Sequence, residues 1–292
     1  MCGYLSRMRV VRSVLMSVAV LFLLLLADIF IETNIPIVKT VVLESSKIPS
    51  GSSLKILQIS DLHGKEFGRD NALLLNRVKS SNADMIVITG DLIDAKSHSY
   101  EGVYSLIEKL ARINPAIYFV SGNHEHWNPK SDELIGSISS LGVGILNGTS
   151  VRFKKGDQEY NVCGIDFLYV NKGGEARYYG GRNGLEKPFR GIDTRKYTVF
   201  LSHSPKIVEQ YKKVPADLVL SGHTHGGQVR LPLVGSAVRL DPGFFSKFDR
   251  GLFDLGSGTM MYVDSGVGTS IIPVRLFCRS QISLIEIRGG DN

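Results

Sequence analysis

Short runs of apolar residues alternate along the chain with segments whose apolar positions repeat at helical spacing. Three runs, 54–60, 85–89 and 116–120, have the length of buried strands. Between them, 71–80 and 100–113 carry apolar side chains three and four positions apart, which is typical of amphipathic helices. The order strand, helix, strand, helix, strand predicts parallel strands covered by helices, and therefore an α/β domain.

The second half of the chain is richer in predicted strands. A helix is expected before it, from Asn128 to about Leu141, because Asn128 can cap it and Pro129 suits its first position. Strands are predicted at 143–146, 151–154, 159–165, 197–202, 218–221, 260–264 and 282–287, with a glycine-rich loop at 171–184 and a helix from about Pro205.

The N-terminal segment is far more apolar than the rest. Residues 14–31 form an 18-residue stretch that is charged only at Asp28, just long enough to cross the hydrocarbon core of a bilayer. Arg7, Arg9 and Arg12 precede it and favour a cytoplasmic N-terminus. A cleaved signal peptide is the alternative, but no small-x-small cleavage pattern follows directly. We predict a single-pass anchor in the cell membrane, with the remainder extracytoplasmic.

Residues 32–53 are mixed in character and contain two prolines and the run Ser50-Gly51-Ser52-Ser53. Such a composition predicts an extended linker. The expected organisation is therefore a membrane anchor at 1–31, a linker at 32–53 and a catalytic domain at 54–292.

Composition narrows the chemistry. The 292 residues are 43% hydrophobic, which supplies an ample core. The net charge of +6 suits an anionic partner such as a phosphate ester, an acidic lipid surface or nucleic acid, but a solvated basic surface explains it without any partner. Three cysteines without C-x-x-C spacing indicate neither a disulfide framework nor a thiolate zinc site.

Side chains that bind metals follow five of the predicted strands. The run 85–89 ends in Gly90-Asp91, which delivers a carboxylate to the carboxyl end of a sheet, where α/β proteins place ligands. A turn or capping role is the alternative for Asp91 taken alone. The other four motifs are Ser60-Asp61-Leu62-His63-Gly64, Gly122-Asn123-His124-Glu125, Ser202-His203-Ser204 and Ser221-Gly222-His223-Thr224-His225-Gly226.

Taken in order, D-x-H, G-D-x-x-D, G-N-H-E, a lone histidine after a strand and G-H-T-H resemble the calcineurin-like metallophosphoesterase superfamily. The resemblance extends from about Lys55 to Ile287. It implies a four-layer α/β/β/α sandwich, here preceded by one transmembrane helix, and a centre of two divalent metal ions. Carboxylate, imidazole and amide donors without thiolates fit manganese, iron or zinc.

The resemblance also implies which residues bind each ion. One set is Asp61, His63, Asp91 and His225, and the other is Asp91, Asn123, His203 and His223, so that Asp91 bridges the two ions. Residues two apart in an extended segment point to one side, so each D-x-H or H-T-H pair is expected to face the centre. His98 and His126 lie outside the motifs and are interpreted as ordinary core or surface histidines.

The resemblance assigns catalysis to His124, which is similar to the family's catalytic histidine and acts on the leaving oxygen or the phosphoryl charge. Asp94, the second aspartate of G-D-x-x-D, is expected to orient that ring by accepting its other N–H. The implied reaction is direct attack by a metal-bridging hydroxide, without a phosphoenzyme. Ala95-Lys96 stand where protein Ser/Thr phosphatases have Arg-Gly, which argues against protein-phosphatase activity.

Residues 268–279 are similar to the tail of the bacterial YkuE/YaeI-like branch of membrane-associated or exported phosphoesterases, although Ser280-Gln281 departs from the Pro-Glu expected there. This resemblance suggests a phosphodiester substrate on a phospholipid or an envelope lipid precursor, and no nucleic acid is expected. The alternatives are a phosphomonoesterase acting on phosphoproteins or small molecules, and a metal-stabilised binding domain. Arg275 and Arg279 either bind the substrate anion or face solvent.

The insert that follows G-H-T-H, residues 231–250, mixes aromatic and basic side chains. Phe244, Phe245 and Phe248 either contact lipid, aided by neighbouring cations such as Arg250, or pack the loop onto the domain.

Overall fold

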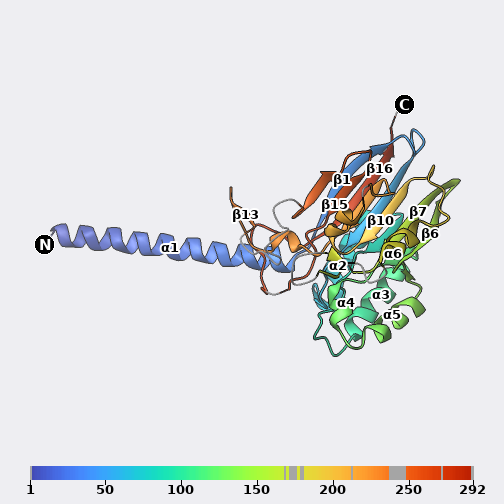
Figure 1. The fold of residues 1–292 in the computed structure, drawn as a ribbon. Helices are drawn as coiled ribbons and strands as arrows, with labels where there is room; N and C mark the ends of the chain where they lie inside the picture. The colour runs from blue at the N-terminus through green and yellow to red at the C-terminus, as the bar shows by residue number, and fades with distance from the viewer. Residues whose placement is uncertain are drawn as a thin grey trace.

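A long helix leads into a body in which two β-sheets face each other (Figure 1). This computed structural model describes residues 2–167, 169–170, 176–177, 181–211, 213–236, 248–270 and 272–290. The layers of the body follow from the two sheets and the helices that cover their outer faces.

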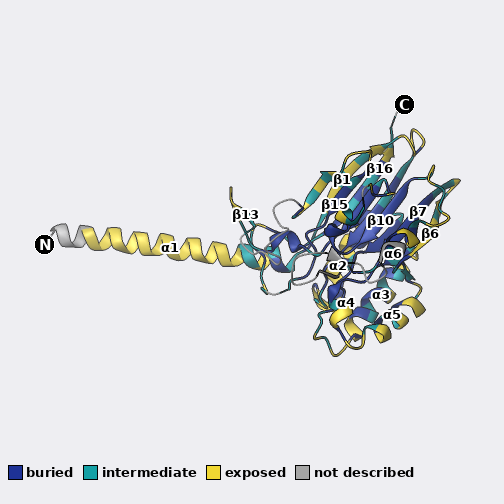
Figure 2. Cartoon of the chain, in the orientation of Figure 1, coloured by how far each residue is buried: buried dark blue, intermediate teal, exposed yellow. Residues whose placement is uncertain are grey.

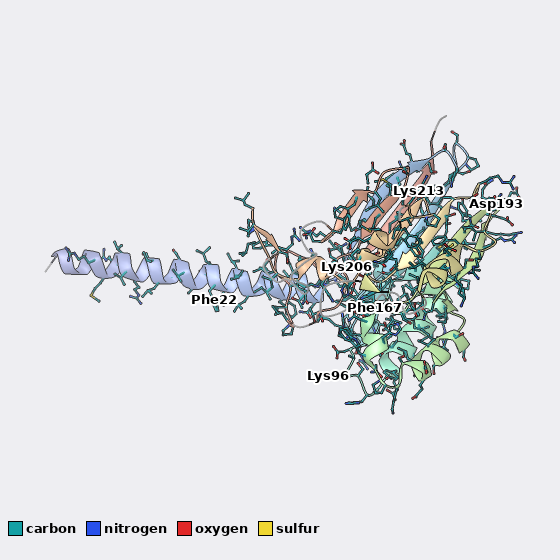
Figure 3. The ribbon with its side chains drawn as sticks, viewed as in Figure 1. Phe22, Lys96, Phe167, Asp193, Lys206 and Lys213 are labelled. Atoms are coloured by element: carbon teal, nitrogen blue, oxygen red, sulfur yellow. The ribbon has the colours of Figure 1, made fainter. Side chains whose placement is uncertain are left out.

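Helix α1 (Cys2–Asn34) extends away from the body, and its apolar side chains, including Phe22, are exposed (Figures 1 and 3). Within the described chain it is the one helix long and apolar enough to cross a membrane. Its last turn is bonded to the body: the Lys65 ammonium donates to the Thr33 carbonyl at 2.6 Å, and the Arg275 N–H donates to the Thr33 hydroxyl at 2.8 Å. The apolar part of α1 is thus free to contact lipid while its C-terminal end is held.

The first sheet has six strands, in the order β1 (Ile37–Ser45), β16 (Gln281–Gly289), β2 (Ser53–Ile59), β3 (Met85–Ile88), β4 (Ile117–Phe119) and β5 (Gly144–Ile145). Strands β2 to β5 are parallel, and β16 is antiparallel to β2. The segment 32–53, expected to be a linker, supplies an edge strand of this sheet, because β1 pairs with β16 along its whole length. The sequence did not indicate this strand, because β16 lies at the other end of the chain and the residues of β1 are half-exposed, as those of a linker are.

The second sheet also has six strands, in the order β14 (Gly251–Asp254), β15 (Met260–Val263), β11 (Leu218–Ser221), β10 (Thr198–Ser202), β7 (Gln158–Ile165) and β6 (Thr149–Lys155). Its four central strands are parallel, and both edge strands are antiparallel.

Helices cover the outer face of each sheet. Three pack on the first sheet: α2 (Ala72–Ser81), α3 (Glu101–Ile113) and α5 (Ser131–Ser140). The shorter α6 (Gly181–Glu186), η2 (Lys187–Phe189) and η3 (Pro205–Gln210) cover the second. A buried apolar core fills the space between the sheets, as the dark blue strands of Figure 2 show. The fold is therefore the four-layer α/β/β/α sandwich that the sequence predicts.

One predicted boundary is wrong. Helix α5 begins at Ser131, so neither Asn128 nor Pro129 starts it. Asn128 instead ends the short helix α4 (Asn123–Trp127), and its side-chain oxygen accepts hydrogen bonds from the Tyr100 hydroxyl at 2.7 Å and the Lys130 N–H at 2.9 Å. The Asn128 side chain is therefore bonded to Tyr100 and does not cap α5.

Polar side chains connect the two sheets through the apolar core. The Gln58 amide on β2 donates to the Ser221 carbonyl on β11 and to the Thr89 hydroxyl, both at 2.9 Å. Tyr262 on β15 and Ser283 on β16 share a second bond of 2.8 Å. These buried bonds fix how the strands of one sheet lie over those of the other.

Candidate metal centre

The seven predicted ligands follow five parallel strands and meet at one place between the sheets. Asp61 and His63 follow β2, Asp91 follows β3, Asn123 opens α4 after β4, His203 follows β10, and His223 and His225 follow β11. The carboxylates and imidazoles form overlapping groups whose ligand atoms lie within 4.8 Å of one another. The structure thus brings together residues that are up to 164 positions apart.

The first group contains Asp61, His63 and His225. The two imidazoles face each other, with 3.0 Å between their Nε2 atoms, and His225 Nε2 lies 3.6 Å from Asp61 Oδ1. The Nδ1 atoms of both rings are buried without a hydrogen-bond partner among the described residues. Only one N–H can lie between the facing Nε2 atoms of two neutral imidazoles, and the Nδ1 atoms remain without partners, so this arrangement fits a cation between the rings.

The second group surrounds His203. Its Nδ1–H donates to the Thr89 carbonyl at 2.8 Å, which leaves the lone pair on Nε2. Around Nε2 lie Asn123 Oδ1 and His223 Nδ1, both at 3.0 Å, and Asp91 Oδ2 at 3.2 Å. Four atoms with lone pairs converge, which is the donor set that a divalent cation requires.

Asp91 lies between the two groups, with its ligand atom within 4.8 Å of those of His63 and His124 on one side and of His203 and His223 on the other. Its Oδ2 lies 3.7 Å from His63 Nε2 and 3.2 Å from His203 Nε2, whereas its Oδ1 accepts the His124 N–H at 2.9 Å. One carboxylate oxygen therefore faces both groups, which is the position of a bridging ligand.

Burial and mutual charge shift the pKa values of these residues. Burial raises the pKa of Asp61 to about 7 and lowers that of His63 to about 4. Burial also lowers the pKa of His225 well below its usual value. At the Asp91–His203 pair mutual attraction overcomes burial, so the pKa of Asp91 falls and that of His203 rises to about 9. A cation bound between these two would displace the proton that His203 holds.

The backbone at the ligands is not extended, contrary to expectation. Five ligands have φ in the left-handed region: Asp61 at 53°, His63 at 51°, Asp91 at 53°, His223 at 72° and His225 at 51°. Each such conformation costs of order 1–3 kcal/mol for a residue with a side chain. The pairs do face the centre, but because the chain turns sharply after the strand rather than because it continues straight.

Glycines next to the ligands leave room for them. A Cβ on Gly122 would collide with the Asp91 carboxylate, and a Cβ on Gly222 would collide with Ser60 and the Asp61 carboxylate. Ser60 in turn donates to Asp61 Oδ2 at 2.5 Å. The two carboxylates therefore pack directly against the backbone of glycines, which have no side chain.

His124 lies beside the first group, with its ring centroid 4.5 Å from that of His63 in an edge-on arrangement. The Ala95 N–H donates to His124 Nδ1 at 2.9 Å, whereas the Asp94 carboxylate lies 3.5 Å from the same atom. The closer partner is therefore the Ala95 N–H rather than Asp94, the acceptor expected from the motif. Since Nδ1 accepts, the ring proton is on Nε2.

A cavity of about 650 Å³ opens over the centre and is lined by Asp91, Asn123, His124, His223 and His225 together with Asp94, Ala95, Lys96, Trp127 and Ser270. Its size suits a small-molecule group. Trp127 is 60% exposed, with its ring centroid 5.4 Å from that of His124. Lys96, at the edge of the body in Figure 3, brings a cation to the same cavity.

Comparison with known proteins agrees with this geometry. The family model for calcineurin-like phosphoesterases matches residues 54–227, more than half of the chain. The chain belongs to this family. The resemblance carried by the five motifs is therefore confirmed, and the chain is a metallophosphoesterase by family.

Several family relatives are similar over most of the chain. A protein of Aquifex aeolicus (strain VF5) described as an uncharacterized metallophosphoesterase is 32% identical over 267 residues, 90% of this chain and 95% of that protein. The metallophosphoesterase YkuE of Bacillus subtilis (strain 168) is 26% identical over 252 residues, 84% of this chain and 83% of YkuE. A Danio rerio transmembrane protein with metallophosphoesterase domain is 31% identical over 263 residues, 87% of this chain but 57% of that protein.

The glutamate of the family motif G-N-H-E received no role from the sequence. Glu125 is fully buried, and its carboxylate accepts the N–H groups of Gly122 at 2.7 Å, Asp91 at 2.8 Å and Ile93 at 3.3 Å. It therefore holds the turn that presents Asp91. Its place in the motif was the only available signal, because Asp91 and Ile93 are 34 and 32 positions away.

Phe167 was also missed. It follows β7, and its ring centroid lies 6.0 Å from that of His203 and 5.8 Å from that of His223 (Figure 3). It forms an apolar wall beside the second group. An isolated phenylalanine after a strand gives no signal of this in the sequence.

Both interpretations of Arg275, as a residue that binds the substrate anion and as one that faces solvent, are wrong. Its side chain is fully buried, and it donates to the carbonyl oxygens of Gly268 and Ser265 at 2.8 Å and of Cys278 at 3.2 Å. It organises the C-terminal loop under the centre. Arg279 is half-buried and donates to the Ile35 carbonyl at 3.1 Å.

Phe248 is buried against Phe253, with ring centroids 5.1 Å apart, so it packs the insert onto the body. Phe244 and Phe245, for which lipid contact or packing was expected, lie outside the described residues.

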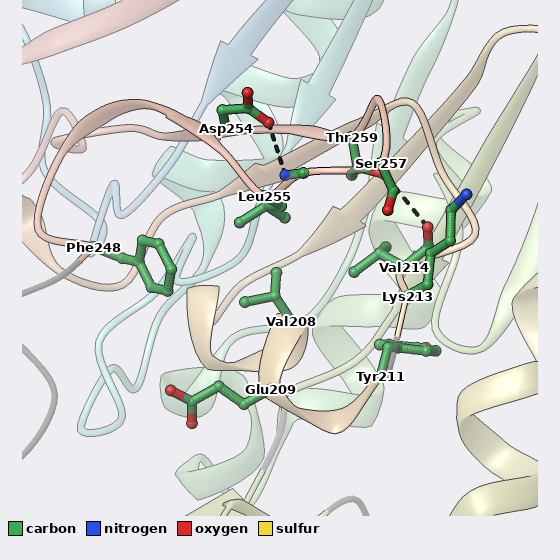
Figure 4. Close-up of a pocket in the computed structure, with 11 residues that line it drawn as sticks. Val208, Glu209, Tyr211, Lys213, Val214, Phe248, Asp254, Leu255, Ser257 and Thr259 are labelled. Atoms are coloured by element: carbon green, nitrogen blue, oxygen red, sulfur yellow. Dashed lines mark hydrogen bonds between the residues drawn. The ribbon is translucent and has the colours of Figure 1, made fainter.

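A separate cavity of about 290 Å³ lies beneath the second sheet (Figure 4). Its walls include Val208, Lys213, Phe248 and Leu255, and the Thr259 hydroxyl donates to the Val214 carbonyl beside it at 3.5 Å. None of the seven ligands lines this cavity, so it is distinct from the metal centre.

Proposed function

We propose that this protein hydrolyses a phosphoester at a centre of two divalent cations. The observation that carries the proposal is the position of Asp91, whose Oδ2 faces His63 on one side and His203 on the other. Asp61, His63 and His225 would complete one site, and Asn123, His203 and His223 the other, with manganese, iron or zinc as the ion.

When bound, such a pair of cations would lower the pKa of a water to supply hydroxide for direct attack on phosphorus and would neutralise phosphoryl charge. The residues of the chain determine where the phosphoryl group lies. Asp91, Asn123 and the three imidazoles line one end of the cavity, and Lys96 brings a positive charge to its wall.

His124 is proposed to be the catalytic acid. To act as an acid the ring must be an imidazolium, whose Nδ1–H would be accepted by Asp94, 3.5 Å from that atom. Donation of the Nε2 proton to the leaving oxygen would then leave the neutral ring, the form in which Nδ1 accepts the Ala95 N–H. His124 would thus donate its proton while the bond from phosphorus to the leaving oxygen breaks.

The substrate proposed is a phosphodiester on a phospholipid or an envelope lipid precursor. Two features support it: the long apolar helix α1, and the exposed Trp127 at the cavity, since an indole ring suits a lipid interface. The competing proposal is that the substrate is a phosphomonoester of a small molecule or a protein.

We also propose that residues 1–31 anchor the chain and that the catalytic domain lies outside the cytoplasm, because Arg7, Arg9 and Arg12 precede the apolar stretch. A fusion after Asn292 tests this orientation. An alkaline phosphatase reporter, active only outside, should be active, and a green fluorescent reporter at the same position should be dark. The reverse pattern would place the domain in the cytoplasm.

The decisive experiment uses the full chain in lipid nanodiscs. Metal content is measured by elemental analysis, and turnover is compared on bis(p-nitrophenyl) phosphate, p-nitrophenyl phosphate and a phosphodiester lipid embedded in the disc. We expect two ions per chain and a preference for diesters. His126→Ala serves as the control, since that residue lines no wall of the cavity. Faster turnover of the monoester would replace the diesterase proposal.

A further inference from the structure

A small hairpin projects from the body directly after the metal ligands of β11. It consists of β12 (Arg230–Leu231) and β13 (Gly235–Ser236), and the Val234 N–H closes its turn on the Leu231 carbonyl at 3.2 Å. The turn carries the most exposed apolar side chains of the described body: Leu233 is 108% exposed and Val234 is 74% exposed.

The turn chemistry is unusual for a water-exposed hairpin. Pro232 occupies the second turn position, and Leu233 follows with φ 67°. This geometry ordinarily takes glycine or asparagine at the third position, because a side chain there strains the backbone. Leucine therefore occupies a position that disfavours it, without any packing inside the body to compensate.

The hairpin lies close to the point where α1 enters the body. The Arg230 N–H donates to the Leu276 carbonyl at 2.9 Å, which ties the hairpin to residues 275–280. The same segment holds the end of α1: the Ser280 N–H donates to the Glu32 carbonyl, and the Cys278 N–H donates to the Glu32 carboxylate, both at 2.8 Å. Figures 1 and 2 show the exposed hairpin on the side of the body from which α1 extends.

We infer that the tip of this hairpin, residues 231–234, inserts into the apolar boundary of the membrane that α1 crosses, and is a second membrane contact of the protein. A bilayer explains the exposed apolar turn, since it would remove Leu233 and Val234 from water. It also explains why the turn lies near α1, because the proposed anchor holds the bilayer on this side of the body. Where the end of α1 meets the body, Lys39, Arg250 and Arg279 line a cleft of about 630 Å³ together with Glu32, and such cations suit anionic headgroups.

The contact would also set the position of the metal centre. The turn η4 (His225–Gly227) leads directly into β12, and the Arg230 guanidinium donates to the Gly226 carbonyl at 2.9 Å. Two attachments to one membrane, at α1 and at the hairpin, would restrict rotation of the body about α1. The cavity would then keep a fixed height and direction relative to the lipid headgroups.

The test is the depth of a fluorescent label in liposomes of phosphatidylcholine brominated on its acyl chains. The full-length chain carries Cys2→Ser, and Cys163 and Cys278 are buried. A bimane label is placed on Leu233→Cys or, where the turn geometry is ordinary, on Val234→Cys. The controls are Leu21→Cys within α1 and Asp157→Cys in the β6–β7 turn, which lies at the far side of the body (Figure 1).

Both hairpin labels should be quenched at least half as strongly as the label at position 21, whereas the label at position 157 should keep its brightness. Hairpin labels as bright as that at position 157 would overturn the inference. The inference rests on the proposed membrane anchor and not on hydrolysis. A bright label at position 21 would therefore overturn both the anchor and the inference, whatever the activity of the protein.

Discussion

The two sheets contribute different chemistry to the same centre. The first sheet supplies both carboxylates, Asp61 and Asp91, together with one amide and His63. The second sheet supplies only imidazoles, at the ends of β10 and β11. Neither set alone would suit the proposed pair of cations, because the first has only one imidazole and the second has no negative charge. The centre therefore exists only where the sheets face each other.

The residues of the centre are held by left-handed backbone turns and by hydrogen bonds between the sheets. Both carboxylates of the first sheet stand on left-handed backbone and are fixed by N–H groups, as where the His223 N–H donates to Asp61 Oδ1 at 3.0 Å. His203 on the second sheet has ordinary backbone and is oriented across the interface, through the Thr89 carbonyl on the first. Left-handed backbone therefore occurs on both sides of the centre, and contacts between the sheets orient Asp61 as well as His203.

The largest effect is expected from Asp91→Asn, because this side chain serves both groups. Turnover should fall by more than ~10²-fold, which exceeds the usual cost of losing an outer-shell partner, and the content of both ions should drop. The measurements are turnover and elemental analysis on the same sample. Asp94→Asn is the matched control, since its carboxylate belongs to neither group and the ions should stay. Full activity in Asp91→Asn would refute the shared centre.

Removing one histidine from each group sharpens the comparison. His203→Ala and His63→Ala should each leave about one ion per chain instead of two, because each ring is a proposed ligand of one ion only. Metal titration followed by calorimetry measures the number of sites and their affinities. Loss of both ions in either variant would mean that the two groups fold and bind as one unit.

His124→Ala separates catalysis from metal binding. We expect turnover to decrease by ~10²–10⁴-fold, the usual contribution of a positioned acid, with both ions retained. His126→Ala, two positions along the same short helix, should change turnover little. A variant that loses metal would instead identify His124 as a ligand.

The smallest effect is expected from the bond between the sheets. Gln58→Leu removes one of the two N–H donors of the Ser221 carbonyl, which still accepts from Asp264, so the free energy of unfolding should fall by about 0.5–1.5 kcal/mol. Chemical denaturation measures this change. Gln158→Leu, at the start of β7, is the control, because its side chain makes no hydrogen bond within the described residues. Weaker metal binding in Gln58→Leu alone would show that the sheet interface adjusts the centre.

Much of the fold could be predicted because it depends on local patterns. Apolar runs of strand length, separated by amphipathic helices such as 100–113, predict a layered α/β body. The residues that meet between the sheets were also recognisable as candidate ligands, since each follows a strand in a short motif. The edge strand β1 was not, because its stability comes from β16, more than 200 positions away.

By itself, then, the sequence determined which residues are available for the centre, the order in which strands deliver them, and the apolar length of α1. Only the tertiary structure decided how these residues are used. It buried Arg275 beneath the centre, made the Ala95 N–H the closer partner of His124, and brought Glu125 under the Asp91 turn. Motifs record residue identity and spacing along the chain, whereas hydrogen-bond partners and burial depend on contacts between segments that are distant in sequence.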